Sequence, residues 1–151
     1  MICVLQRVKK AAVSIDGQTV GQCGAGLCIL LGVAQGDTED DARALADKTL
    51  NLRIFTDEND KMNLSVKDID GEALTVSNFT LLASYRKGRR PDYIMAAAPD
   101  EANRLYEYFC SLLKGGLRHT ATGRFGADME ISLVNDGPVT IVMDSKVILK
   151  K

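Results

Sequence analysis

The chain has 151 residues, of which 46% are hydrophobic and 26% are charged, and its formal net charge is −1. This length favours one domain, 1–151, and this apolar content excludes a mainly disordered chain. A protein that coats nucleic acid without selectivity is usually far more basic, so any contact with RNA must use a local patch. We find no signal peptide, and no apolar run reaches the roughly 18 residues that span a bilayer, so we expect a cytoplasmic protein without a membrane partner.

Hydrophobic periodicity predicts a chain rich in strands. Apolar alternation or short apolar runs predict strands at 2–8, 12–15, 18–20, 27–33, 51–55, 74–82, 129–133, 139–143 and 147–149. Asp16-Gly17 suits the tight turn of a hairpin, because both central residues of a type I′ turn need a positive φ.

Two helices are expected between these strands. Thr38 is placed to cap the first helix, which runs to Leu50. The second begins near Pro99 and stops at Gly115-Gly116. The expected fold class is therefore α/β, with a curved mixed, barrel-like β core and two main helices packed outside in a single domain.

Most familiar chemical motifs are missing from the chain. The cysteines form no CxxC pair; they are Cys3, Cys23, Cys28 and Cys110. The single histidine, His119, cannot complete a zinc site with them at the usual spacing. The glycines of 21–26 stand in the reverse of a dinucleotide-binding order. We therefore expect core cysteines in a reducing compartment, a structural histidine, and neither metal nor cofactor.

A basic run follows the strand predicted at 74–82. It holds four of the 19 basic residues within five positions: Arg86, Lys87, Arg89 and Arg90. One interpretation is a solvated charged loop. The other is a clamp for the phosphates of a nucleic acid or an anionic ligand, because clustered Arg and Lys beside a glycine suit phosphate groups.

Two segments place polar or turn-forming residues where strands should be apolar. Ser77-Asn78-Phe79-Thr80 brings hydroxyl and amide groups into an apolar strand. Gly137-Pro138 separates two predicted strands. The second segment can be an ordinary hairpin turn, or its X-Pro bond can be cis and present two rigid backbone carbonyls on one side.

With these residues the chain resembles the D-aminoacyl-tRNA deacylases, also called D-tyrosyl-tRNA deacylases, over essentially its whole length. The resemblance rests on collinear segments at 4–8, 30–33, 50–55, 61–64, 86–91, 122–129 and 134–140. The family's two signature motifs are Ser-Gln-Phe-Thr and a Gly-Pro with a cis bond. The first reads Ser77-Asn78-Phe79-Thr80, with Asn one methylene shorter than the usual Gln, and the second is intact at Gly137-Pro138. The retained Ser and Phe resemble the D-specific branch of the family.

The resemblance implies an enzyme that hydrolyses the ester between a D-amino acid, or glycine, and the 3′-terminal adenosine of tRNA. It implies catalytic residues in Ser77-Asn78-Phe79-Thr80. It also implies a substrate-binding set in which Gly137 and Pro138 reject L-amino acids: Gly137, Pro138, Phe125 and Met129. The expected assembly is a homodimer in which each Gly-Pro enters the partner's pocket. Aminoacyl-tRNA, and not DNA, is the expected nucleic-acid partner of the basic run 86–90.

Two mechanisms stay open at this point. Thr80 is the conventional nucleophile, but no His, Lys or carboxylate is visibly paired with it. The alternative, which we favour, is that the 2′-OH of the substrate ribose assists an attacking water while main-chain amides hold the carbonyl oxygen. Two other functions also compete, a tRNA-binding module without activity and a Thr80-nucleophile hydrolase of small esters.

Overall fold

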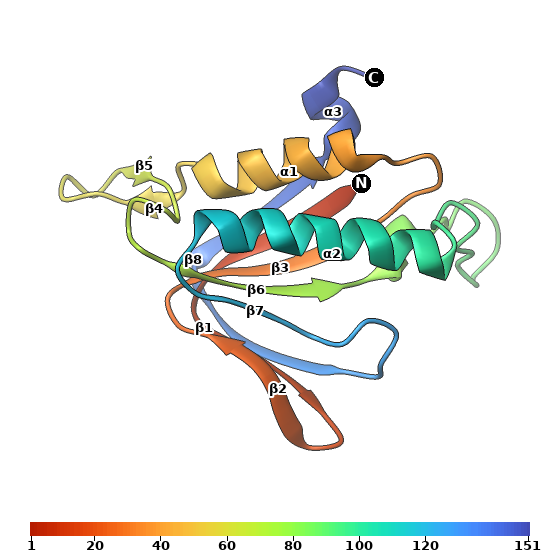
Figure 1. The fold of residues 1–151 in the computed structure, drawn as a ribbon, viewed down its shortest axis with the longest axis horizontal. Helices are drawn as coiled ribbons and strands as arrows, with labels where there is room; N and C mark the ends of the chain where they lie inside the picture. The colour runs from red at the N-terminus through yellow and green to blue at the C-terminus, as the bar shows by residue number, and fades with distance from the viewer.

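A curved, six-stranded sheet forms the centre of the computed structural model, which describes residues 1–151 (Figure 1). Its strands are β1 (Ile2–Ile15), β2 (Gln18–Cys23), β3 (Gly26–Gly32), β6 (Glu72–Ser77), β7 (Thr120–Thr122) and β8 (Glu130–Asp144). The order is β2-β1-β3-β6-β7, and β8 pairs with the other edge of β1. A small separate hairpin consists of β4 (Phe55–Thr56) and β5 (Met62–Leu64).

The sheet is mixed and nearly closes on itself. β1 pairs antiparallel with β2, β3 and β8, whereas β3–β6 and β6–β7 are parallel. β2 then approaches β7 closely. The evidence is at Gly21, where an added Cβ would lie 2.5 Å from the carbonyl oxygen of Thr122. The predicted α/β class with a curved, mixed, barrel-like core is confirmed.

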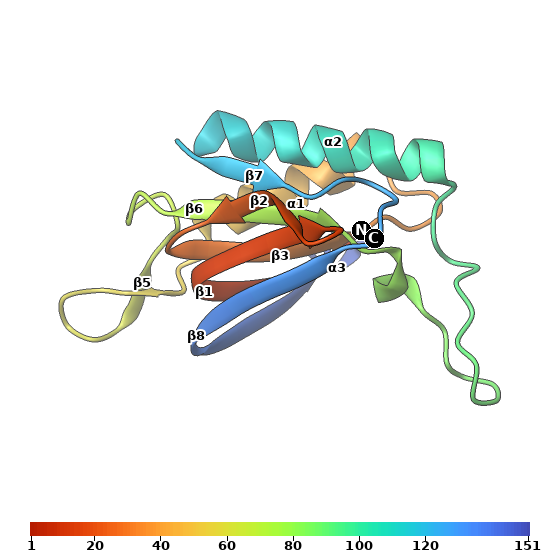
Figure 2. The same cartoon turned by 90° about the horizontal axis from the view of Figure 1, so that it is seen from below.

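Two long helices, α1 (Glu39–Asn51) and α2 (Pro99–Gly116), lie side by side on one face of the sheet (Figures 1 and 2). Both begin as predicted, α1 after its N-cap Thr38 and α2 with a proline in its first turn. Leu45 of α1 and Phe109 of α2 are fully buried in one core cluster with Ile29 of β3. Burying each such side chain stabilises the fold by about 1.5–3 kcal/mol. No helix is both long and apolar enough to cross a membrane.

Three predicted boundaries are wrong because local pattern does not show where a chain changes conformation. The strands at 2–8 and 12–15 are one strand, β1, which turns at Asp16-Gly17 into β2 as predicted, with φ of 50° and 77°. The strand predicted at 51–55 shrinks to Phe55–Thr56, because α1 continues through Asn51. The strand predicted at 74–82 ends at Ser77, and the next residues form a short 3-10 helix, η1 (Phe79–Leu82).

The C-terminal predictions also need correction. The strands predicted at 129–133 and 139–143 are a single strand, β8, so Gly137-Pro138 is not a hairpin turn. The strand predicted at 147–149 is instead a helix, α3 (Ser145–Leu149). Asp144 starts this helix, because its carboxylate accepts a hydrogen bond from the Lys146 backbone N–H at 2.9 Å.

A buried polar cluster joins α3 to α1 and to the N-terminus. The Met1 amine donates to Ser145 Oγ at 2.6 Å and lies 2.8 Å from the carboxylate of Asp37. Ser145 Oγ donates to Asp41 of α1 at 2.8 Å. Burial alone would raise the pKa of Asp41, but hydrogen bonds from Ser145, Thr38 and Lys151 bring that pKa well below its usual range.

The four cysteines are free thiols, and three of them are buried. Burial raises the pKa of Cys3 to about 12 and, together with neighbouring charges, that of Cys23 to about 11. A thiol reacts as its thiolate, so such cysteines are inert near neutral pH. They serve as small apolar residues of the core, as predicted.

Candidate functional site

A hollow of about 830 Å³ lies beside the N-terminal end of α2. The end of β6 with η1, the segment before α2 and the loop between β7 and β8 form its walls. Six of the residues predicted for the site line it: Ser77, Asn78, Phe79, Thr80, Phe125 and Met129. The fold therefore brings together two sequence segments that lie more than forty positions apart.

The chain begins to line the pocket where the pairing of β6 with β3 ends. Asn78 N–H donates to the Leu31 carbonyl at 2.9 Å, and η1 then turns away from the sheet. The Leu81 N–H returns to the Asn78 carbonyl at 3.3 Å. The N–H groups of Phe79 and Thr80 stand in the first turn of η1, where a helix provides no acceptor for them.

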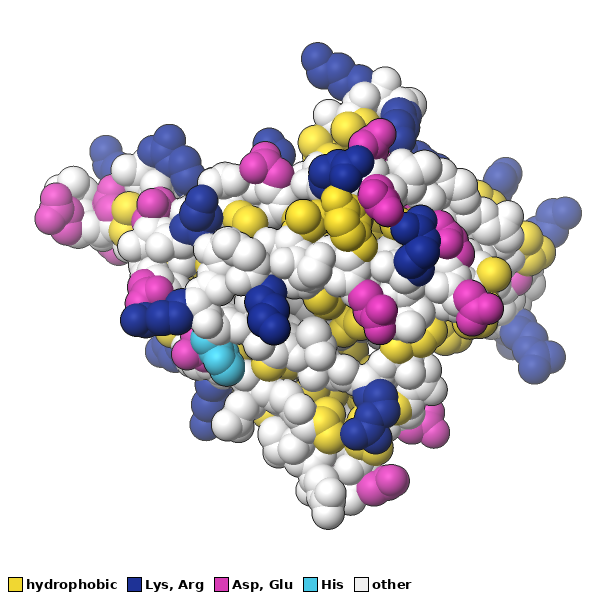
Figure 3. All heavy atoms as spheres, viewed as in Figure 1, with side chains coloured by type: hydrophobic (Ala, Val, Ile, Leu, Met, Phe, Trp, Pro, Cys, Tyr) yellow, Lys and Arg dark blue, Asp and Glu magenta, His cyan; other side chains and the backbone are white.

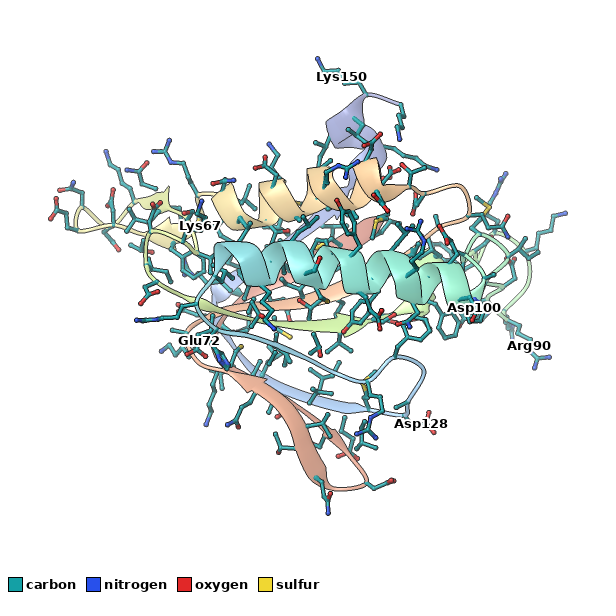
Figure 4. The ribbon with its side chains drawn as sticks, viewed as in Figure 1. Lys67, Glu72, Arg90, Asp100, Asp128 and Lys150 are labelled. Atoms are coloured by element: carbon teal, nitrogen blue, oxygen red, sulfur yellow. The ribbon has the colours of Figure 1, made fainter.

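The hydroxyl of Thr80 is hydrogen-bonded to the side chain of Asn78. Thr80 Oγ1 donates to Asn78 Oδ1 at 2.5 Å. An amide oxygen is not a base under ordinary conditions, so this contact orients the hydroxyl without activating it. The protein's single histidine does not line the pocket, since His119 contacts Gln22 and Glu72. Figure 4 shows Glu72 toward the other end of the molecule from Asp128, which lines the pocket.

Aromatic rings form much of the pocket wall. The Phe79 and Tyr93 rings meet edge to face with centroids 5.0 Å apart. The ring of Phe125 packs against that of Tyr106 with centroids 6.1 Å apart. The Tyr106 hydroxyl donates a hydrogen bond to the Thr75 carbonyl at 2.9 Å, which fixes the ring. Tyr93 was not predicted from the sequence, because no spacing or motif indicated that the chain beyond the basic run returns to the pocket.

Asp128 is the only acidic or basic residue among those that line the pocket. Its place in the segment 122–129 is visible in the sequence, but nothing there distinguished it from a surface carboxylate. No group of three or more His, Cys, Asp and Glu side chains converges anywhere in the structure.

Gly137-Pro138 does not reach this pocket in its own chain. The Gly137–Pro138 peptide bond is cis, and neither residue is buried. They lie against Arg7, which also contacts Ile54 just before β4, toward the C-terminal end of α2 (Figure 1). The pocket lies at the other end of α2, so one copy of the chain keeps the two motifs apart.

A bulge in β8 carries Gly137-Pro138. Gln6 of β1 pairs with Thr140 and Val8 pairs with Asn135, so the residues 136–139 face Arg7 alone. Asn135 Nδ2 donates to the carbonyls of Arg7 and Val139, each at 3.0 Å. These bonds replace the missing ladder and hold the bulge in one shape.

Arg7 is the main support of this bulge. It is only 8% exposed, and its Nε donates to the Asp136 carbonyl at 3.0 Å while Nη1 donates to the Ile54 carbonyl at 2.8 Å. Its Nε also lies 3.4 Å from the Asp136 carboxylate. The guanidinium thus joins β1, the bulge and the segment before β4 at one point.

We expect Arg7→Ala to lower the free energy of unfolding by about 2–3 kcal/mol, because hydrogen bonds to a charged donor are lost and buried carbonyls are left unpaired. Urea unfolding measures the change. Arg43→Ala is the control, since Arg43 is half exposed beside Glu39 and Asp40 and such pairs contribute about 0–1 kcal/mol. Equal losses in the two variants would contradict this role of Arg7.

The basic run forms a loop on the rim of the pocket. Ser84 and Asp92 close it through two backbone hydrogen bonds, of 2.8 and 2.9 Å, shortly after η1 and directly before Tyr93. We call residues 84–92 the rim loop. None of its four cations has a carboxylate within 4.0 Å; they are Arg86, Lys87, Arg89 and Arg90.

The rim loop reaches beyond the body of the protein, as Figure 2 shows for the segment before α2. Figure 4 places Arg90 at the edge of the molecule near the start of α2. Over α1 and α2, by contrast, acidic and basic side chains are intermixed (Figure 3). Four cations without a carboxylate partner are therefore grouped in one loop beside the pocket.

Solved structures with this arrangement define the class of the fold. One is the c-Myc DNA Unwinding Element Binding Protein; it is 38% identical and superposes with a TM-score of 0.89 over 95% of this chain and 98% of that chain. Another, a probable eukaryotic D-amino acid tRNA deacylase, is 17% identical with a TM-score of 0.80 over the same shares of the two chains. The second likeness concerns the fold alone.

Sequence comparison identifies the family. The D-Tyr-tRNA(Tyr) deacylase family model matches residues 4–144, and the chain belongs to this family. A D-aminoacyl-tRNA deacylase of Caldicellulosiruptor saccharolyticus is 58% identical over 97% of this chain and 98% of its own. One from Bacillus cereus is 52% identical over 97% of this chain and all of its own. The resemblance inferred from the sequence motifs is confirmed.

Proposed function

We propose that the protein is a D-aminoacyl-tRNA deacylase, which hydrolyses the ester between a D-amino acid, or glycine, and the 3′-terminal adenosine of tRNA. The observation that carries the proposal is the apolar pocket over Ser77-Asn78-Phe79-Thr80 in a chain of this family. Its size suits an aminoacylated nucleoside, because pockets for such ligands measure about 300–1,000 Å³. The protein acts in the cytoplasm, where its substrate is made and used.

The first turn of η1 stabilises the reaction's oxyanion. Phe79 N–H and Thr80 N–H both lack helical acceptors and belong to residues that line the pocket. As water attacks the ester carbonyl, negative charge develops on its oxygen, and such donors lower the barrier because they are already oriented. An aminoacyl ester is reactive, so positioning and oxyanion stabilisation carry most of the catalysis.

The general base comes from the substrate. The Thr80 hydroxyl donates to Asn78, neither histidine nor lysine lines the pocket, and Asp128, its one carboxylate, makes no hydrogen bond to Thr80. When the amino acid is esterified at the 3′ oxygen, the ribose 2′-OH adjoins the ester, and it assists the attacking water. Ser77 and Phe79 shape the wall against which the aminoacyl group is held.

A second copy of the chain completes the site. Gly137-Pro138 is accessible and outside its own pocket, which suits a group that enters a partner's pocket. β8 pairs only with β1, so its other edge is free, and it presents exposed Ile131, Leu133 and Val142. A long free edge with apolar residues is a surface that proteins normally cover. A homodimer covers it and brings each Gly-Pro to the other copy.

The same element rejects L-amino acids. Gly137 has no side chain, so its backbone can approach the substrate's α-carbon closely. A backbone wall at that point leaves no room for a side chain of L configuration but admits hydrogen or a D side chain. Phe125 and Met129, which line the pocket, enclose the remaining substrate.

The rim loop binds the tRNA phosphates. We expect Arg89→Ala combined with Arg90→Ala to raise the KM for aminoacyl-tRNA several-fold and to leave the unfolding free energy unchanged, because exposed charges add little to stability. The loss should shrink as salt rises, since fewer counterions are released from the RNA. Deacylation against tRNA concentration at two salt concentrations measures both effects. An unchanged KM at both would show that the loop is only a solvated loop.

Deacylation of D-Tyr-tRNA and L-Tyr-tRNA by the purified protein tests the function itself. We expect release of D-tyrosine at a rate far above that of L-tyrosine. Binding of tRNA without release would favour the inactive tRNA-binding module. Equal activity on a small ester that lacks RNA, with a covalent adduct on Thr80, would favour the small-ester hydrolase.

A further inference from the structure

Tyr85 is the most exposed of the large apolar side chains, at 83%. It lies in the rim loop, directly after Ser84, which is one of the two residues that close the loop. Its ring meets no other aromatic ring, unlike that of Tyr93, which packs on Phe79. Exposing an aromatic ring on a loop that extends into solvent leaves apolar surface uncovered, and a ring beside clustered cations is the combination that binds single-stranded nucleic acid.

The surroundings of Tyr85 fit RNA. The next five positions contain Arg86, Lys87, Arg89 and Arg90, all without a carboxylate partner. The loop leaves the body between η1 and Tyr93, both of which contribute to the pocket wall. A nucleotide chain whose last residue occupies the pocket can therefore leave the pocket past this loop.

We propose that the ring of Tyr85 stacks on an unpaired base just upstream of the substrate's terminal adenosine. The inference rests on the proposed function and adds what it lacks, a means of selecting a single-stranded 3′ end. Proteins that hold single strands combine cations for the backbone with aromatic rings for the bases. Paired bases offer no free face to such a ring, so the arrangement recognises the unpaired end and not the duplex stem.

A protein partner fits this surface less well. A second copy of the chain that docked through its own rim loop would place eight cations together without a carboxylate from either loop except Asp92. Like charges at such a contact oppose association. RNA supplies the negative charge and the flat apolar faces at the same time.

Steady-state deacylation with two substrates tests the proposal. One substrate is D-Tyr-tRNA and the other is D-tyrosine esterified to adenosine alone, which has no upstream base. Tyr85→Ala should lower kcat/KM for D-Tyr-tRNA about tenfold through KM, the size of loss expected when one stacking ring is removed. It should leave kcat/KM for the adenosine ester unchanged. Tyr85→Phe, which keeps the ring, should behave as wild type with both substrates.

Salt dependence separates stacking from charge. The loss in Tyr85→Ala should be the same at low and high salt, whereas the loss in Arg89→Ala should shrink as salt rises. Light scattering follows the oligomeric state of each variant. The proposal is overturned if Tyr85→Ala matches wild type on tRNA, loses equally on both substrates, or loses activity because the oligomer dissociates. Absence of deacylation by the wild-type protein on both substrates would instead refute the proposed function.

Discussion

Gly137→Ala is expected to lower the rate of D-aminoacyl-tRNA deacylation about a hundredfold, because a small misplacement of a group that contacts the substrate has effects of that size. Gly137 has a φ of +136°, which L side chains rarely adopt. A Cβ there would lie 2.8 Å from Val139 Cγ2, 2.9 Å from Val139 N and 3.1 Å from Arg7 Nη2. The backbone and the buried guanidinium cannot both move aside, so the bulge must change shape. Residual activity should also discriminate less between D-Tyr-tRNA and L-Tyr-tRNA.

Gly17→Ala is the matched control for this substitution. Gly17 also has a positive φ, of +77°, but a Cβ there would meet nothing within 4 Å. It lies in the β1–β2 turn and does not line the pocket. The Gly17→Ala protein should lose some stability and keep both its rate and its D/L ratio. A Gly137→Ala protein that is folded and retains both would show that Gly137-Pro138 is only a bulge.

Mixing two damaged chains asks whether the site is shared between copies. Phe79→Ala damages the pocket, and Gly137→Ala damages the segment that is proposed to enter the partner's pocket. If the site is shared in this way, a heterodimer of the two variants contains one site with both substitutions and one site with neither. Random pairing makes half of the dimers mixed, and activity should recover to roughly a quarter of wild type. If the mixture shows only the average of its two components, each site is built within one chain.

The sequence predicted the elements whose ends are chemically marked. Thr38 and Pro99 identify where α1 and α2 begin, and Asp16-Gly17 identifies the first turn, because caps and turn residues act locally. Prediction failed where a long-range contact decides the conformation. Residues 135–138 are of types that are common in turns. Hydrogen bonds from the side chains of Arg7 and Asn135 nevertheless hold this segment inside β8. Asp144 is a residue type common in turns, but its carboxylate accepts a backbone hydrogen bond that starts the helix α3.

The candidate site shows the same division. Polar residues in an otherwise apolar strand are a local feature, so the sequence alone marks Ser77-Asn78-Phe79-Thr80 as unusual. The return of Tyr93 to the pocket could not be predicted, because it depends on how the rim loop closes through Ser84 and Asp92. The distance between Gly137-Pro138 and the pocket of its own chain depends on the course of β8 across the sheet, which no local pattern contains.

The substrate's 2′-OH should matter far more than the hydroxyl of Thr80. We expect D-Tyr-tRNA that ends in 2′-deoxyadenosine to be hydrolysed about 10²–10⁴-fold more slowly than the ordinary substrate, the range typical of general acid–base assistance. The deoxy substrate should still compete for binding with an unchanged inhibition constant. This control separates a loss of chemistry from a loss of affinity.

Thr80→Ala should lose less than about tenfold in kcat, whereas removal of a true nucleophile costs roughly a thousandfold or more. The physical reason is the bond from Thr80 Oγ1 to Asn78 Oδ1, which provides no acceptor able to take the hydroxyl proton as the oxygen attacks. The neighbouring backbone N–H groups stay in place when the side chain is shortened, so oxyanion stabilisation should survive. Single-turnover rates for Thr80→Ala on the ordinary substrate and for wild type on the deoxy substrate decide between the mechanisms. Near-complete loss in Thr80→Ala, together with good turnover of the deoxy substrate, would make Thr80 the nucleophile and remove the 2′-OH from the mechanism.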